Sequence, residues 1–219
     1  MHCAPQLIEA LSARDYEGPI TSVLKRNPLV LSRSVRGFAF ARLVAPEFRF
    51  GTDFRADFVL LGPYSGGCDI HFVELEPPGA ALFTKRGRPA KRLNEALSQV
   101  GDWKRYIEKH RDTVLHELSK HVQSHELVFE YREAEPTCNG GWPLYHPEIW
   151  LHWHYTIIIG RRAALSMREQ GIKSSFSHTH DVHIMTYDRL LEAAEEMDKL
   201  PNGSVQLIPM PVPKASEDT

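Results

Sequence analysis

The chain has 219 residues, of which 42% are hydrophobic and 25% charged, so it is expected to fold as one α/β domain. Its formal net charge of -2 shows that it is not uniformly basic like a dedicated nucleic-acid binder. No apolar run approaches the roughly 18 residues that cross a bilayer, and no basic segment followed by an apolar one opens the chain, so the cytoplasm is the expected location. Three cysteines without CxxC spacing predict neither a disulfide framework nor a thiolate zinc site.

The N-terminal part is predicted to combine short helices with a run of strands. In chain order we expect helices over 5–14 and 20–26, a stop at Asn27-Pro28, strands over 35–43 and 48–50, and a β-hairpin with strands over 57–61 and 70–75 joined by a loop over 62–67. The hairpin is the clearest of these elements, because two apolar, β-prone runs flank a segment rich in glycine and proline.

The remaining chain is predicted to alternate helices and strands. In chain order we expect a loop over 79–90, a helix over 91–109 that continues with one break to residue 120, a loop over 134–148, a strand over 148–159, a helix over 161–170, a strand over 183–186 and a helix over 188–200. This order predicts a single domain over 1–200 with a mixed β-sheet flanked by helices, and a Pro-rich polar tail over 201–219 that is expected to be mobile.

Three carboxylates stand at the ends of the predicted hairpin strands. Asp57 opens the first strand, and Glu74 and Glu76 lie two residues apart near the end of the second, which places them on one face. Carboxylates at a strand end are usually solvated, but here both strands are apolar. Gathered carboxylates repel one another and raise one another's pKa, and a divalent cation such as Mg²⁺ removes that conflict. A metal site on the hairpin is therefore predicted.

Several motifs resemble those of known nuclease families. The run 57–60, a variable loop and the run 72–77 look like the core of PD-(D/E)XK nucleases. The chain resembles the Shedu family of anti-phage defence proteins at further points, over roughly 20–195: a helix ending at Asn27-Pro28, the pattern Gly-x-x-Phe-Arg-x-Asp-Phe at 51–58, a glutamine within 96–103, and the later segments 157–161 and 185–191. The resemblance implies a PD-(D/E)XK, restriction-endonuclease-like fold.

The resemblance also implies roles for individual residues. Asp57 and Glu74 would bind Mg²⁺ or Mn²⁺, and Gln99 would orient a metal ligand, a water or the phosphate. The family expects lysine where this chain has Glu76, which would then hold the water or ligate a second ion, as in nucleases with an ExE site; Lys85 or Lys91 is the other candidate for the missing cation. Residues expected to bind phosphates are Arg55, Lys85, Arg86, Arg88 and Arg92.

These expectations define a first hypothesis and two alternatives. The first is a metal-dependent DNA endonuclease of an anti-phage defence system, which hydrolyses phosphodiester bonds with a metal-activated water and self-associates as a homo-oligomer. The second is a catalytically degenerate nucleic-acid-binding or sensor module of the same fold. The third is a zinc hydrolase built on histidines at short spacing, for which the candidates are His152, His154, His178, His180 and His183.

Overall fold

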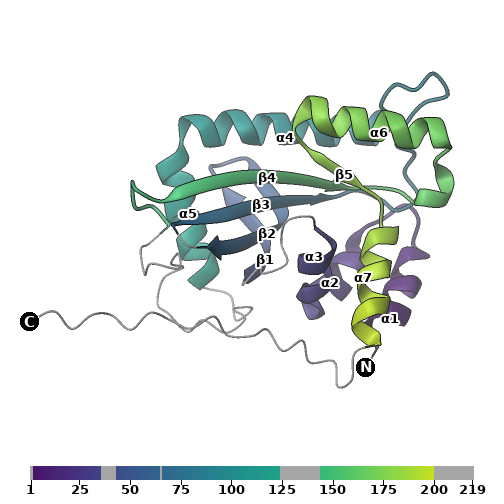
Figure 1. The fold of residues 1–219 in the computed structure, drawn as a ribbon, viewed down its shortest axis with the longest axis horizontal. Coiled ribbons are helices and arrows are strands. Elements are labelled where there is room, and N and C mark those ends of the chain that lie inside the picture. The colour runs from purple at the N-terminus through teal and green to yellow at the C-terminus, as the bar shows by residue number, and fades with distance from the viewer. Residues whose placement is uncertain (1, 36–42, 65, 124–143, 200–219) are drawn as a thin grey trace, which may run out of the picture.

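A computed structural model describes residues 2–35, 43–64, 66–123 and 144–199. The structure is a mixed five-stranded β-sheet with helices on both faces, which confirms the predicted α/β sheet flanked by helices (Figure 1). The tail predicted to be mobile, most of the predicted strand over 35–43 and most of the loop over 134–148 lie outside the described residues. In the described part of the chain, no helix is long and apolar enough to cross a membrane.

The strands follow one another in the sheet in chain order, β1-β2-β3-β4-β5. Their bounds are β1 Leu43–Phe50, β2 Phe54–Tyr64, β3 Gly67–Leu75, β4 Trp150–Ile158 and β5 His183–Met185. The first three strands are antiparallel, whereas β4 runs parallel to both β3 and β5. The central strand β3 is therefore paired along both edges, which fixes the position of the residues near its carboxyl end.

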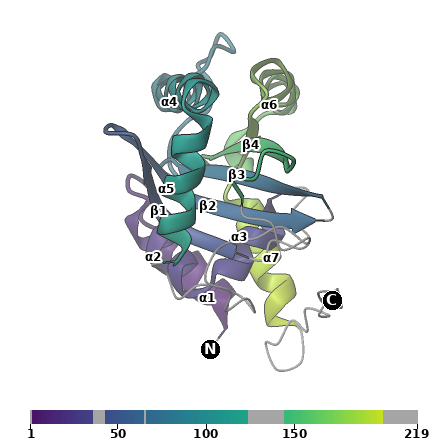
Figure 2. The same cartoon turned by 90° about the vertical axis from the view of Figure 1, so that its left-hand side faces the viewer.

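Two apolar cores lie on the two faces of the sheet. Helices α4 (Lys91–Lys109), α5 (Arg111–Gln123) and α6 (Met167–His180) cover one face, where Phe50, Phe72 and Trp103 pack together. Helices α1 (Cys3–Leu11), α2 (Gly18–Arg26), α3 (Pro28–Ser34) and α7 (Asp188–Asp198) cover the other face, and Figures 1 and 2 show α4 and α6 on the opposite side of the sheet from α1 and α7.

One local prediction in the N-terminal half was wrong in its boundaries. The hairpin loop over 62–67 is too long, because pairing continues to Tyr64 opposite Gly67, and Gly66 supplies the left-handed φ of 80° that the tight turn requires. Of the predicted strand over 35–43 only the two end residues are described: Val35 follows α3, and Leu43 begins β1, which includes the predicted piece over 48–50. Pro28 ends α2 as predicted but also opens α3, a position that suits proline.

The predicted helix over 161–170 is also wrong. A short 3₁₀ turn occupies Arg162–Ala164, and α6 starts only at Met167. Ser166 determines this start, because its hydroxyl accepts from the Glu169 N–H while the Glu169 carboxylate accepts from the Ser166 N–H. None of the residues of α6 is fully buried, so its apolar pattern is too weak to reveal its length.

Candidate functional site

Asp57 and Glu74 lie opposite each other on adjacent strands. The β2–β3 register pairs Phe58 with Val73, so the next step along the ladder brings Asp57 across from Glu74. Side chains directly opposite in an antiparallel pair share one face of the sheet. The backbone N–H of Leu75 donates to Asp57 Oδ2 at 2.8 Å and holds that carboxylate in place. The hairpin therefore joins these two predicted residues.

Gln99 on α4 is the third member of the group. Its Nε2 donates to Glu74 Oε1 at 2.9 Å, so the amide fixes the orientation of the carboxylate. Within the described residues, the second oxygen of Glu74, Oε2, is buried and has no hydrogen-bond partner. A buried polar oxygen without a partner costs free energy, and a bound cation is one way to satisfy it.

These side chains line a cleft of about 570 Å³ between the hairpin and α4. Arg55 also lines it, with Nη2 at 4.0 Å from Asp57 Oδ1 and about half of its side chain exposed. Sequence reasoning missed several polar residues of the cleft, namely Asp53, Glu95, Ser98 and Asp102. The last three had a detectable signal, because together with Gln99 they recur at three- and four-residue intervals along α4 and so form one helix face.

The electrostatics of the cleft favour a cation. Burial raises the pKa of Asp57, although the Leu75 N–H opposes the shift. Burial, and then the neighbouring charges of Asp57 and Glu76, raise the pKa of Glu74 to about 9, against the hydrogen bond from Gln99. Without a cation Glu74 therefore keeps its proton at neutral pH. A divalent ion would displace that proton, and Mg²⁺ is commonly held by one or two carboxylates plus water and phosphate.

Comparison with known families agrees with this region. The model of the family described as Shedu protein SduA, C-terminal, matches residues 16–191, which is most of the chain and includes the whole cleft. The chain belongs to the Shedu family. This confirms the resemblance predicted over roughly 20–195, and membership suggests a role in anti-phage defence. A search of curated proteins gave no match.

Glu76 of this Shedu family member does not line the cleft, although strand periodicity predicted that it would share a face with Glu74. Glu76 is only 8% exposed and is absent from the residues that line the cleft. Its backbone N–H donates to the Ile158 carbonyl at 2.9 Å, and its backbone carbonyl accepts from the Tyr187 hydroxyl at 2.7 Å. Burial raises its pKa to about 7, while Arg92 opposes the shift. In residues 2–35, 43–64, 66–123 and 144–199, no three His, Cys, Asp or Glu side chains are arranged to hold a metal, so Asp57 and Glu74 have no third carboxylate placed to share an ion with them.

The predicted phosphate-binding residues do not gather in one place. Arg55 lines the cleft, whereas Arg92 lies near Glu95, at 3.9 Å, and Lys91 pairs with the same carboxylate at 3.8 Å. Lys85, Arg86 and Arg88 lie on the tight turn after β3, outside the cleft lining. A Cβ added to Gly87 of this turn would come within 3.0 Å of the Ile172 side chain, so the turn packs against α6.

The five predicted histidines are spread over three elements. His152 and His154 lie on the exposed phase of β4, as predicted, and His154 Nε2 is 2.9 Å from Asp69 Oδ1. His178 and His180 end α6 rather than lying in a loop, and His183 begins β5. Sequence reasoning missed a sixth histidine, His71, which is buried in the centre of β3 and bonds to Thr156; its signal was a lone histidine inside an apolar run.

Proposed function

We propose that this Shedu protein is a divalent-metal-dependent endodeoxyribonuclease of the PD-(D/E)XK type that cleaves DNA in anti-phage defence. One observation carries the proposal: Glu74 lines a cleft together with Asp57, and one of its carboxylate oxygens is buried without a hydrogen-bond partner among the described residues. A carboxylate pair on adjacent strands, each member anchored by one hydrogen bond, is a ready pair of ligands for a hard cation.

Asp57 and Glu74 would hold Mg²⁺ or Mn²⁺. A bound ion of this kind lowers the pKa of a coordinated water and stabilises charge on a phosphodiester during hydrolysis. Gln99 keeps Glu74 in one orientation, and the Leu75 N–H does the same for Asp57. Because both anchors come from regular elements, the ligands are positioned before any ion arrives.

Cationic side chains would place the DNA backbone against this pair. Arg55 lies on the same strand face as Asp57, with a half-exposed guanidinium suited to a phosphate. Lys85, Arg86 and Arg88 extend the positive charge beyond the cleft along the turn, and Arg92 does so on α4. In this proposal the latter residues contribute affinity rather than chemistry, and their contribution weakens with salt.

Glu76 would act on the site through its charge. It stands where related nucleases carry lysine, and its carboxylate raises the pKa of Glu74 although it does not line the cleft. A catalytically degenerate DNA-binding module is the second candidate function, because no lysine is among the described residues that line the cleft. In this second case the carboxylate pair would bind an ion without supporting hydrolysis.

Cleavage of supercoiled and linear DNA with Mg²⁺ or Mn²⁺ tests the proposal. We expect the wild type to cleave, and Asp57→Asn and Glu74→Gln to lose at least about 10³-fold in rate, because metal-ion stabilisation of the transition state amounts to several kcal/mol. Asp53→Asn is the matched control, since Asp53 lines the same cleft but bonds only to the neighbouring Thr52 in the described part of the chain.

Two results would go against the nuclease. DNA binding without cleavage by the wild type, with both ions and both DNA forms, supports the binding module instead. Cleavage that survives in Asp57→Asn and Glu74→Gln places the chemistry elsewhere. Light scattering on the same preparations measures the predicted self-association.

A further inference from the structure

A second cavity, of about 550 Å³, lies between α6, the strands β4 and β5, and the start of α7. Among the residues that the structure describes, it shares none of its lining with the cleft of Asp57 and Glu74. Its volume falls within the roughly 300–1,000 Å³ of small-molecule sites. A DNA duplex engages an extended surface instead, about 1,000–2,500 Å² of protein, so the cavity suits a small ligand.

The lining of this cavity is predominantly cationic. Arg162, Lys173 and Arg189 line it, whereas Asp181 is the one carboxylate among its described lining residues and is already paired with Lys104 Nζ at 3.2 Å. Burial lowers the pKa of His71, which disfavours a positive charge on that ring. The hydroxyl-bearing residues Ser174, Ser177 and Thr186 add groups able to donate hydrogen bonds.

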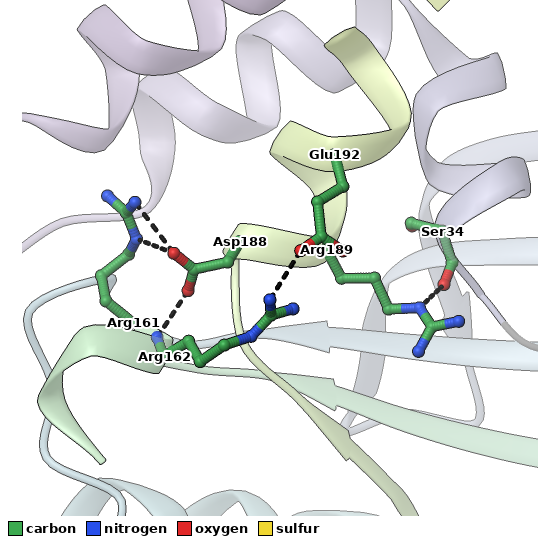
Figure 3. Close-up of polar contacts among 6 residues, drawn as sticks. All are labelled: Ser34, Arg161, Arg162, Asp188, Arg189 and Glu192. Atoms are coloured by element: carbon green, nitrogen blue, oxygen red, sulfur yellow. Dashed lines mark hydrogen bonds and ion pairs between the residues drawn. The ribbon is translucent and has the colours of Figure 1, made fainter. Parts of the chain in front are cut away.

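Arg189 differs from the two arginines beside it. Figure 3 shows Arg161 bonded to Asp188, at 3.0 and 3.2 Å, and Arg162 bonded to Glu192, at 2.6 Å. The half-buried guanidinium of Arg189 bonds only through Nε, to the Ser34 carbonyl at 2.9 Å, and no carboxylate within the described residues pairs with it. Its two terminal nitrogens therefore remain for a ligand, and a half-buried cation without a counter-charge favours an anion.

Apolar side chains line another part of the same cavity. Leu165, Ile184 and Met185 line it together with the cations, so the cavity combines an anion-binding part with an apolar part. A metal ion is disfavoured, because the histidines of the described chain form no metal-binding group with each other or with Asp, Glu or Cys. Arginine binds phosphate with paired, charge-assisted hydrogen bonds, and lysine binds it as a point charge.

We propose that this cavity binds a small phosphate-bearing molecule of nucleotide size, with its phosphate on Arg189 and Lys173 and its apolar portion towards Leu165 and Ile184. The site is independent of the proposed nuclease chemistry, because none of its described lining residues lines the other cleft. Its ligand would bind equally to a protein whose carboxylate pair has been removed.

Titration calorimetry without divalent ions tests this site, with pyrophosphate, ATP and adenosine as probes. We expect the wild type to bind pyrophosphate and ATP with Kd below about 1 mM and not to bind adenosine. Arg189→Gln and Lys173→Met should each weaken binding about tenfold or more, because a hydrogen bond to a charged group contributes about 1.5–3 kcal/mol. Lys120→Met on α5 is the matched control, and Asp57→Asn should bind like the wild type. Circular dichroism confirms that each variant is folded.

Three outcomes would overturn the assignment. The first is no binding of either phosphate probe to the wild type up to 10 mM, a concentration about ten times the expected limit. The second is equal loss in Lys120→Met, or unchanged affinity in both Arg189→Gln and Lys173→Met. The third is displacement of ATP by a short 5′-phosphorylated oligonucleotide but not by pyrophosphate, which would assign the cations to a nucleic-acid phosphate.

Discussion

The cleft of Asp57 and Glu74 and the cationic cavity beneath α6 carry opposite charge and are built in different ways. The carboxylate cleft lies between a continuous hairpin and a helix with five buried residues, so its acidic groups are fixed by strand register and a packed core. The cationic cavity lies beneath α6, a helix with no buried residue, and its lining comes from the ends of several elements. Rigid elements thus position the groups proposed for chemistry, whereas a lightly packed helix covers the proposed ligand site.

Replacing Gln99 tests whether a fixed orientation of Glu74 in the cleft matters for DNA cleavage. We expect Gln99→Leu to lower cleavage by about 10–100-fold, because residues that orient metal ligands contribute about that much. Gln99→Glu should lose at least as much, since a second carboxylate would repel Glu74. Steady-state cleavage rates measure both, with Ser98→Ala on the same helix face as the control. Wild-type rates in Gln99→Leu would show that Glu74 needs no orienting partner.

The raised pKa of Glu74 predicts a steep pH dependence for metal binding. Glu74 must release its proton to ligate an ion, so Mn²⁺ affinity should rise about tenfold per pH unit up to about pH 9 and level off above it. Calorimetry in two buffers of different ionisation enthalpy measures both the affinity and the proton released. A flat affinity between pH 6 and pH 9 would be inconsistent with Glu74 as a ligand of raised pKa.

The same shift predicts that Glu74 destabilises the metal-free protein as pH rises. The unfolded chain loses this proton near pH 4.5 and the folded chain only near pH 9, so between these values the folded state binds more protons and the free energy of unfolding falls with pH. Glu74→Gln removes this cost. Its Tm relative to the wild type should therefore increase from pH 5 to pH 9, by about 2–4 °C per kcal/mol.

Calorimetry of the metal-free proteins checks this, with Glu95→Gln as a control in the same cleft. A Tm difference between Glu74→Gln and wild type that stays constant with pH would contradict the expectation.

Replacing Lys104 tests how weakly α6 is held over the cationic cavity. Of the effects predicted here, this one is expected to be the smallest. Its Nζ donates to the carbonyls of His180 and Asp181, at 2.9 and 2.7 Å, at the C-terminal end of α6. Lys104→Met should leave the fold intact and increase amide hydrogen exchange in α6 by about fivefold, since surface contacts of this kind contribute about 1 kcal/mol. Exchange in α4 is the internal reference. Equal increases in both helices would indicate global destabilisation instead.

Much of the fold could be predicted from the sequence, and so could the two carboxylates that line the cleft. The opposition of Asp57 and Glu74 was predictable because strands have a side-chain period of two and a hairpin is antiparallel. The same rule failed for Glu76, because β3 ends at Leu75 and the alternation no longer holds beyond a strand end. Gln99 followed only from the family resemblance, since nothing local distinguishes it from a surface glutamine.

The cationic cavity was not predictable from the sequence. Its lining comes from segments far apart in the chain, such as His71, Lys173 and Arg189, and single-sequence patterns report only local spacing. The length of α6 was missed for a related reason. Its start depends on the pairing of Ser166 with Glu169, and its apolar residues are too few to produce a helical period.

Helix α4 lines the carboxylate cleft and also contacts Asp181, a lining residue of the cationic cavity. Gln99 and Lys104 are five residues apart, which is about 7.5 Å along the helix axis and about 140° around it. One side chain therefore holds a carboxylate of the cleft while the other grips the end of the helix that covers the cavity. A rotation of α4 about its own axis would therefore disturb both hydrogen-bonded contacts at once.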